Sequence, residues 1–337
     1  MDDLAIIVVS TNEAHWLRPC LTSIFEHVGD IDLDVVLVDN ESTDGTRDLV
    51  EAEFPDVRIV TSENHGFSHA NNRGWLTTDA RYALFLNPDT KILDGTFEQL
   101  VALMDERPRV GLVGVRQVTP SGALWPTIRR FPSALRTLGE ALGSERWPVR
   151  PSWAGQRDLD MRHYEHETQV DWTSGSFMLA RREALLSAGL LDERSFIYTE
   201  EPDLCLRMRK AGWTIAHVPY MTIVHHAGKG GIKPRMEAQN AWAMLHYAQK
   251  HFSLPHRAAF AAALGLGYVI RAARPGRGER VRDRRIASRR ALSTMLGLAP
   301  PPFGDPPETA LRPAHERSLR RDPAPLRGGT DRDTHPH

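Results

Sequence analysis

Short apolar runs alternate with helical patterns along the first third of the chain. Each run has the length and β-branched composition of a strand that is buried on both faces. The runs cover residues 4–10, 34–40, 57–63 and 82–89. Apolar residues at helical spacing follow the first run, from Leu17 to Phe25. Strands and helices joined by short connections predict an α/β fold with a doubly wound, mostly parallel sheet, which binds ligands at the carboxyl ends of its strands.

The pattern is less regular in the second part of the body. Residues 110–118 predict another strand, and residues 125–164 form a mixed region that is rich in Pro, Trp and Arg. Residues 200–213 predict a helix, residues 213–226 one or two strands, and residues 235–251 a final helix. We therefore expect the strands and helices of the body to end near residue 252.

The composition changes after residue 252, first to Ala and Arg and then to Pro, Gly, Asp and Arg. This change predicts a helical basic C-terminal extension over residues 253–299. A tail without fixed structure is expected over residues 300–337. The expected domain is thus residues 1–252, with a first half at 1–118 and a second half at 119–252.

The net charge of −1 at pH 7 hides a division between these parts. Residues 253–337 contain 16 Arg and 8 acidic residues, a net charge of +8, so the body carries −9. Nine of the arginines lie from Arg271 to Arg290, next to the apolar run Ala258–Ile270. An Arg-rich helix with an apolar face fits an anionic membrane surface. The alternative is packing of this helix on the acidic body or on the partner in a homodimer.

Other features of the sequence exclude several classes of protein. The 13 residues of the apolar run are too few to span a bilayer, and no aromatic residues alternate with the arginines as in nucleic-acid-binding segments. The N-terminus lacks the basic residues of a signal peptide. The two cysteines, Cys20 and Cys205, cannot form a disulfide framework. We therefore expect a cytoplasmic protein with no nucleic-acid partner.

Polar residues follow several of the predicted strands. Asp39 and Asn40 end the second strand, and Asp44 comes four residues after Asn40. A carboxylate at a strand end can accept hydrogen bonds from a ribose or a base, while the following helix N-terminus favours phosphate. Helix capping by Asp44 is the simpler alternative.

Two further clusters lie at residues 64–74 (NHGFSHANNRG) and 87–89 (NPD). The asparagines of the first cluster can donate hydrogen bonds to phosphate or to a nucleoside, and its glycines allow close approach of the backbone. A solvated turn before a helix is the alternative. In the second cluster, Asp89 lies at the rim of the sheet and can hold a cation such as Mg²⁺, or it can simply belong to a type I turn.

Glu200, Glu201 and Asp203 form an acidic cluster at the start of a predicted helix. Repulsion and burial raise carboxyl pKa values towards those of a general base. An ordinary i,i+4 ion pair and the helix dipole would also explain these residues. His225 and His226 end the last strand and point to opposite faces, so at most one of them can reach a shared site.

The order of these clusters resembles that of the family 2 glycosyltransferases, GT-A enzymes that transfer a sugar from a nucleotide diphosphate donor. The resemblance covers residues 4–231 and rests on five segments. They are VDNESTDGT, NHGFSHANNRG, LNPDT, WTSGSFMLARREAL and FIYTEEPDLCLRMRKAGW. The RRFP stretch at 129–132 is similar to that of rhamnosyltransferase-like members, which act in cell-wall or polysaccharide assembly. The family implies a Rossmann-like nucleotide-binding half, residues 1–118, and an acceptor half, residues 119–252.

The resemblance also implies roles for individual residues. Those implied in nucleotide-sugar binding are Thr11, Glu13, Asp39, Asn40, Asp44, Asn64, Gly66, Phe67, Asn71, Gly74, Asn87 and Asp89. Those implied on the acceptor side are Trp172, Ser174 and Gly175. Asp89 and His225 would hold Mg²⁺ or Mn²⁺. Glu201 is implied as the catalytic base, with Asp203 and Glu200 as the alternatives.

Two positions depart from the family pattern. Asn87 replaces the first aspartate of the D-x-D motif, so only Asp89 carries a negative charge, and metal affinity without nucleotide should be weak. Glu201 occupies the place of the aspartate in an E-D pair and is longer by one methylene. A single carboxylate acting as a base implies inversion. The sequence offers no candidate for the nucleophile of a double displacement.

The predicted activity is inverting transfer of a sugar, with rhamnose from dTDP-rhamnose as the best match, to a hydroxyl of a glycan or polyprenyl-linked acceptor. The alternatives are transfer from a UDP- or GDP-sugar and non-catalytic binding of a nucleotide-sugar. A nucleotidyltransferase or a NAD-dependent dehydrogenase is disfavoured because neither type of Gly-rich loop follows the first strand. A lipid-linked acceptor and the basic extension together predict a peripheral position on the inner face of the plasma membrane.

Overall fold

The computed structural model describes residues 2–226 and 233–304. Its strands are β1 Leu4–Ser10, β2 Leu33–Asn40, β3 Arg58–Ser62, β4 Tyr82–Leu86, β5 Thr90–Asp94, β6 Val110–Val118, β7 Thr168–Val170, β8 Phe177–Arg181 and β9 Thr214–His225. Its α-helices are α1 Ala14–Glu26, α2 Thr46–Glu53, α3 Phe67–Trp75, α4 Phe97–Glu106, α5 Ala134–Ala141, α6 Arg182–Ala188, α7 Glu200–Lys210, α8 Pro234–His251, α9 Leu254–Ala273 and α10 Glu279–Met295.

One mixed sheet runs through the body in the order β3-β2-β1-β4-β8-β6-β9-β5, and β7 pairs with β9. The first four strands are parallel, as the apolar runs predicted. β8 is inserted antiparallel between β4 and β6. The expected strand 82–89 is shorter than predicted: β4 ends at Leu86, and a turn leads directly into β5. The carboxyl ends of the parallel strands therefore share one edge with the NPD turn.

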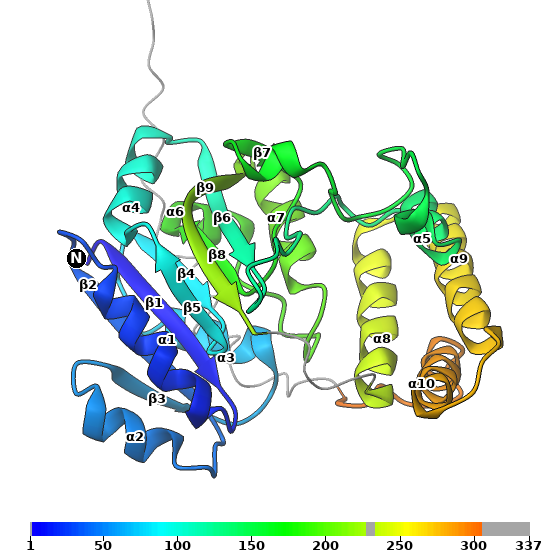
Figure 1. Cartoon of the computed structure of the whole chain (residues 1–337), viewed down its shortest axis with the longest axis horizontal. Helices are drawn as coiled ribbons and strands as arrows, with labels where there is room; N and C mark the ends of the chain where they lie inside the picture. The colour runs from blue at the N-terminus through cyan, green and yellow to red at the C-terminus, as the bar shows by residue number, and fades with distance from the viewer. Residues whose placement is uncertain (1, 227–232, 305–337) are drawn as a thin grey trace, which may run out of the picture.

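Alternate residues of the strands pack on opposite faces of the sheet. In β1, Leu4, Ile6 and Val8 belong to the core that includes α1 and α4. Ala5 and Ile7 belong to the core that includes α3, α6 and α7. Helices cover both faces in Figure 1, which explains why the strand is apolar at every position.

Gly74 is part of this packing. A Cβ at position 74 would lie 2.6 Å from Cγ2 of Ile7 and 2.8 Å from Cγ2 of Val38. The absence of a side chain therefore lets α3 approach β1 and β2. The assignment of Gly74 to the nucleotide-sugar set stays a prediction.

The basic extension folds into a helical layer with parts of the body. Helices α5, α8, α9 and α10 lie together at the right of Figure 1. Phe260, Leu264 and Tyr268 of α9 are buried in a third core shared with α8 and α10. The predicted boundary at residue 252 falls inside this layer, between α8 and α9. The structure thus supports packing on the body for one face of α9.

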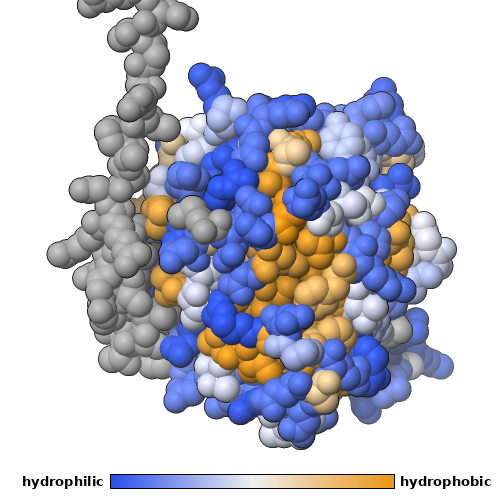
Figure 2. Space-filling view, turned by 90° about the vertical axis from the view of Figure 1, so that its left-hand side faces the viewer, coloured by the Kyte–Doolittle hydropathy of each residue, from blue (hydrophilic) through white to orange (hydrophobic). Residues whose placement is uncertain are grey.

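Other parts of the surface remain apolar. Leu266 and Val269 of α9 are 41% and 51% exposed. Figure 2 shows a separate band of hydrophobic residues on the side of the molecule that lies at the left of Figure 1. Within the described residues, no helix has the length and apolar character needed to cross a membrane. The predicted tail lies outside the described residues from position 305 onwards.

Candidate active site

The loops that follow β1 and β2 are joined by hydrogen bonds. The backbone N–H of Asn12 donates to Oγ of Ser42 at 3.0 Å, and the backbone N–H of Ala14 donates to Oδ2 of Asp44 at 2.9 Å. Asp44 also accepts from the hydroxyl of Thr46 at 2.6 Å. Asp44 therefore fixes the first turns of both α1 and α2, as the capping alternative predicted.

Several residues predicted to bind the nucleotide meet at the ends of β1, β2 and β3. Nδ2 of Asn40 donates to Oδ1 of Asn64 at 2.9 Å and lies 3.3 Å from Oγ1 of Thr11. Asp39 is buried beside them and pairs with Nε of Arg47 at 2.5 Å. Its other oxygen accepts from the backbone N–H of Ser42. Each oxygen of Asp39 thus has one partner within the protein and keeps a second lone pair for a ligand.

Gly66 and Phe67 connect this edge to the segment before α7. Gly66 has a φ of +101°, and a Cβ there would lie 2.0 Å from the carbonyl oxygen of Phe196. The backbone N–H of Phe67 donates to the same oxygen at 2.8 Å. Asn71 donates from Nδ2 to the carbonyl of Phe67 within α3. Only glycine fits both the backbone angle and the space at position 66.

Asp89 and His225 lie together, as expected for two ligands of one cation. Nε2 of His225 is 3.2 Å from Oδ1 of Asp89, and its Nδ1 is buried without a hydrogen-bond partner among the described residues. Burial, and then the charges of Asp89 and Asp44, raise the pKa of Glu13 to about 7. A carboxylate suits Mg²⁺ or Mn²⁺, whereas an imidazole favours a transition metal over Mg²⁺, so these residues fit Mn²⁺ better than Mg²⁺. In residues 2–226 and 233–304, no group of three or more such ligands is present.

His226 has a separate role. Its ring stacks on Trp16 with the centroids 4.4 Å apart, and its backbone N–H donates to the carbonyl of Asp89. The neighbouring histidines therefore divide as the strand geometry predicted: His225 reaches the site and His226 packs.

The acceptor-side segment lies between the NPD turn and α7. The backbone N–H of Asn87 donates to the carbonyl of Ser176 at 3.1 Å, and Oγ of Ser174 is 3.2 Å from Oγ of Ser176. The backbone N–H of Gly175 donates to Oε1 of Glu201 at 2.9 Å. A Cβ on Gly175 would lie 2.8 Å from that oxygen. Gly175 therefore permits a direct backbone contact that orients the carboxylate.

The chemical environment of Glu201 suits a base. Burial raises the pKa of Glu201, while the N–H of Gly175 and the charge of Arg129 lower it. Burial and the charge of Glu201 together raise the pKa of Glu200 well above its ordinary value. A carboxylate with a raised pKa binds a proton more strongly once ionised. Tyr198 and Thr199 carry positive φ angles of 78° and 69° just before α7. This strained turn sets the direction in which the first residues of α7 point.

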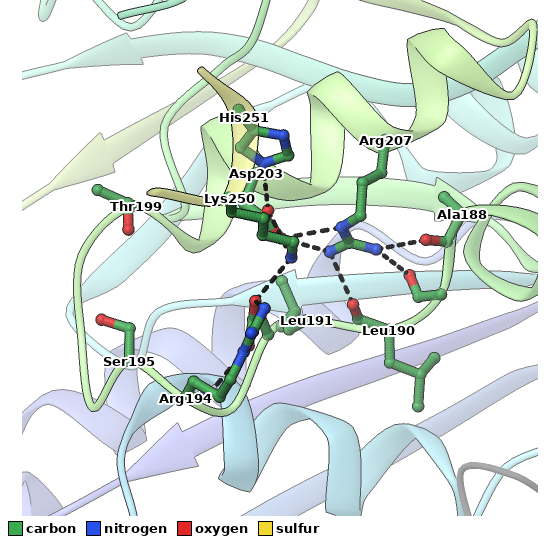
Figure 3. A network of polar contacts seen from close by, with 12 residues as sticks. Ala188, Leu190, Leu191, Arg194, Ser195, Thr199, Asp203, Arg207, Lys250 and His251 are labelled. Carbon is green, nitrogen blue, oxygen red and sulfur yellow. Dashed lines mark hydrogen bonds and ion pairs between the residues drawn. The ribbon is translucent and has the colours of Figure 1, made fainter. Parts of the chain in front are cut away.

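Asp203 faces a different environment (Figure 3). Its carboxylate pairs with Nη2 of Arg207, Nζ of Lys250 and Nε2 of His251, each at 2.7 Å. These partners hold the pKa of Asp203 at about 2 despite its burial. Lys250 also pairs with Asp192 at 2.6 Å. The network ties α7 to α8, and a carboxylate this acidic is a poor proton acceptor.

The three acidic residues therefore separate. Glu201 lines an open cleft of about 540 Å³, whereas Glu200 and Asp203 line a small cavity of about 10 Å³ with Lys250 and Tyr247. This arrangement favours Glu201 as the base over the alternatives Asp203 and Glu200. Of the three, only Glu201 combines access to the cleft with a raised pKa.

The cleft is formed by segments that lie far apart in the sequence. Trp172 and Arg129 line it on the body side, where Nε1 of Trp172 donates to the carbonyl of Arg130 at 2.9 Å. Met244 of α8 and Tyr268 of α9 line the opposite side. None of the site residues predicted from the sequence lies in α8 or α9. The similarity of the RRFP stretch at 129–132 to the same stretch in rhamnosyltransferase-like members was the feature of the sequence that could have placed Arg129 in the site.

Comparison with known proteins decides the family. The model of glycosyl transferase family 2 matches residues 5–185, more than half of the chain. The chain belongs to glycosyltransferase family 2. It is therefore a glycosyltransferase, and the predicted family and enzyme class are confirmed.

The relatives of this glycosyltransferase include rhamnosyltransferases. It is 32% identical over 237 residues to an N-acetylglucosaminyl-diphospho-decaprenol L-rhamnosyltransferase from Mycobacterium tuberculosis, covering 67% of this chain and 76% of the relative. It is 23% identical over 236 residues to the rhamnosyltransferase WbbL from Escherichia coli, covering 66% of this chain and 83% of the relative.

Solved structures show that the fold is GT-A. The mannosyltransferase PcManGT from Pyrobaculum calidifontis, in complex with GDP-Man and Mn²⁺, aligns with a TM-score of 0.50 at 18% identity, covering 89% of this chain and 82% of that one. GalNAc-T7, with UDP, GalNAc and Mn²⁺, aligns with a TM-score of 0.58 at 11% identity, covering 88% of this chain and 56% of that one. The predicted fold class is thus confirmed.

Proposed function

We propose that this glycosyltransferase transfers rhamnose from dTDP-rhamnose, with inversion, to a hydroxyl of a sugar that is linked through a diphosphate to a lipid. The observation that carries the chemistry is the Glu201 carboxylate, which lines the cleft and is held by the N–H of Gly175. The names of the M. tuberculosis and E. coli relatives support rhamnose, and the first of them also supports the diphospholipid acceptor. A UDP- or GDP-sugar donor is the alternative.

The residues of the site fit direct displacement at the anomeric carbon. The Glu201 carboxylate takes the proton from the acceptor hydroxyl as that oxygen attacks the sugar. The N–H of Gly175 holds one carboxylate oxygen and leaves the other for the proton. Asp203 is engaged in ion pairs, and Glu200 lines the small cavity rather than the cleft, so neither carboxylate is placed to act as the nucleophile of a double displacement. Transfer through a single base inverts the anomeric configuration.

Asp89 and His225 would hold the divalent cation, and Mn²⁺ in the structural relatives supports this assignment. Such a cation would stabilise the charge on the departing nucleoside diphosphate. The pair lies at the carboxyl end of β4, across the NPD turn from Ser176, whose carbonyl accepts from Asn87. The donor would then lie on the side of Asp89, and the acceptor would lie in the cleft beside Glu201.

A panel of nucleotide-sugars tests the donor. With Mn²⁺ or Mg²⁺ present, we expect dTDP-rhamnose to raise the melting temperature more than UDP-galactofuranose, a UDP-hexose or GDP-mannose. A ligand at 100 times its dissociation constant stabilises the folded state by about 2.7 kcal/mol. Slow hydrolysis of the same donor in the absence of acceptor provides the second measurement.

The control for this panel is Asp89→Asn, which keeps the shape of the side chain but removes its charge. We expect this variant to lose the metal-dependent part of the stabilisation. Stronger stabilisation by GDP-mannose or a UDP-sugar would replace the rhamnosyl assignment. A metal-dependent shift that survives in Asp89→Asn would show that the cation binds elsewhere.

We also propose that the outer face of α9 touches an anionic membrane, which would bring the enzyme to a lipid-linked acceptor. Leu266 and Val269 are exposed there, and the basic residues of the extension follow them. Replacing both residues by Gln should weaken co-sedimentation with phosphatidylglycerol vesicles by roughly tenfold. Leu93→Gln is the matched control, since Leu93 is 48% exposed on β5. Equal loss in the control, or no loss in the α9 variant, would refute membrane contact by this face.

A further inference from the structure

The cleft beside Glu201 carries more positive than negative charge. Its lining contains five arginines, which are Arg129, Arg146, Arg157, Arg271 and Arg274. It contains three glutamates, which are Glu140, Glu145 and Glu201. An excess of guanidinium groups in a concave site favours an anionic ligand, and guanidinium is suited to phosphate because it can donate two parallel hydrogen bonds.

The glutamates offset only part of this charge. Glu140 accepts from the backbone N–H of Gln156 at 2.8 Å and from its Nε2 at 3.2 Å. Glu145 pairs with Arg157 at 3.3 Å. Glu201 accepts from Gly175. Among the described residues, the other four arginines of the lining have no carboxylate within ion-pair distance.

Two of these arginines are held in place by aromatic rings. The guanidinium of Arg129 lies over Trp172 at 5.6 Å, and that of Arg271 lies over Tyr268 at 4.3 Å. The Nε atoms of both arginines are buried and have no hydrogen-bond partner in the described part of the chain. A buried donor without an acceptor is costly unless a ligand supplies one. Stacking on a ring also reduces the entropy lost when the side chain binds.

The arginines come from both sides of the cleft. Arg129 belongs to the body, whereas Arg271 belongs to the last turn of α9 and Arg274 directly follows that helix. Close packing of α9 on α5 fixes the second side, because a Cβ on Gly267 would lie 3.3 Å from Cβ of Ala141. Figure 1 shows α5 and α9 side by side. The C-terminal extension thus completes a site whose base comes from the body.

We infer that this arginine-lined cleft binds the diphosphate of the acceptor, with Arg129, Arg271 and Arg274 as its principal donors. This inference rests on the proposed function, since it assigns the acceptor side of the same site. A volume of about 540 Å³ has room for a diphosphate and a sugar ring together. The sugar would lie between the arginines and Glu201, which would place its hydroxyl at the base.

The test measures binding of farnesyl diphosphate and of inorganic pyrophosphate by calorimetry. Mg²⁺ and saturating dTDP are present, so that the donor site is filled before either probe is added. We expect both probes to bind the wild-type protein, and we expect Arg271→Gln/Arg274→Gln to bind them roughly tenfold or more weakly. Arg290→Gln is the matched control, because Arg290 is an exposed arginine of α10 outside the cleft.

Kinetics with a diphospholipid-linked sugar separate binding from chemistry. The double variant should raise KM for this acceptor by a similar factor, with kcat within about threefold of wild type and donor hydrolysis unchanged. An acceptor in which a neutral alkyl group replaces the diphosphate should show no such rise in KM.

Equal affinity of the variant and the wild type for both probes would overturn the inference, as would an equal rise in KM for the neutral acceptor. A probe that binds only when dTDP is omitted would assign the phosphate to the donor site and would also overturn it. Absence of donor hydrolysis with every nucleotide-sugar would instead refute the proposed donor chemistry, and the calorimetric result would stand by itself.

Discussion

Replacing Glu201 by glutamine is expected to lower kcat for sugar transfer by about 10²–10⁴-fold, the usual contribution of a general base. Glutamine keeps the size of the side chain and can still accept a hydrogen bond from Gly175 through its amide oxygen. It cannot take a proton from the acceptor hydroxyl. The expected loss therefore lies in the chemical step, while KM for the donor should change little.

Rates at saturating donor and acceptor measure this loss, and the thermal shift with the nucleotide-sugar provides the control for folding and donor binding. The pH profile gives a second readout. Because the pKa of Glu201 is raised in the folded protein, wild-type activity should fall on the acid side at a higher pH than an ordinary glutamate would give. This limb should be absent from the residual activity of the variant. Near-normal turnover of Glu201→Gln would remove Glu201 from the mechanism.

The second large effect is on stability. Asp203→Asn is expected to lower the free energy of unfolding by about 3–5 kcal/mol, because it leaves the buried partners of this carboxylate without its charge. The partners are Arg207, Lys250 and His251, from both α7 and α8. Urea unfolding monitored by circular dichroism measures the difference. The expected loss is large because the Asp203 side chain is only 6% exposed.

The matched control is Asp160→Asn. Both aspartates have a pKa of about 2, but Asp160 makes its ion pair with Arg162 at the surface. Water screens such a pair, so its loss should change stability little. If both variants lost the same stability, burial of the Asp203 network would not be the cause. Donor hydrolysis by folded Asp203→Asn should persist, because Asp203 lies outside the cleft.

The pH dependence of this effect follows from the lowered pKa. A carboxyl group that ionises more readily in the folded state than in the unfolded state stabilises the fold above its unfolded pKa. For Asp203 that contribution is complete above about pH 4 and is lost as the pH falls towards 2. The difference in stability between wild type and Asp203→Asn should therefore shrink over this acid range.

The sequence by itself determined the parallel part of the sheet in the first half of the chain. Continuous apolar runs at 4–10 and 34–40 correspond to β1 and β2 because a central parallel strand must be apolar on both faces. Each run ends in a polar loop, and parallel strands bring such loops to one edge. Asp39, Asn64 and Asp89 could thus be placed near one another from strand order alone. The antiparallel direction of β8 could not be predicted from the sequence, because a short, mostly apolar run has the same pattern in a parallel and in an antiparallel strand.

The tertiary structure alone decided which carboxylate faces the cleft. Residues 200, 201 and 203 lie within one turn of α7, so the local sequence alone does not distinguish which of the three carboxylates acts as the base. Packing of α8 brings Lys250 and His251 to Asp203 and leaves Glu201 at the cleft. The same packing brings Arg271 to the site from 70 positions further along the chain. Local patterns determine where strands and helices form, whereas the charge around a buried carboxylate depends on partners that only folding brings within a few ångströms.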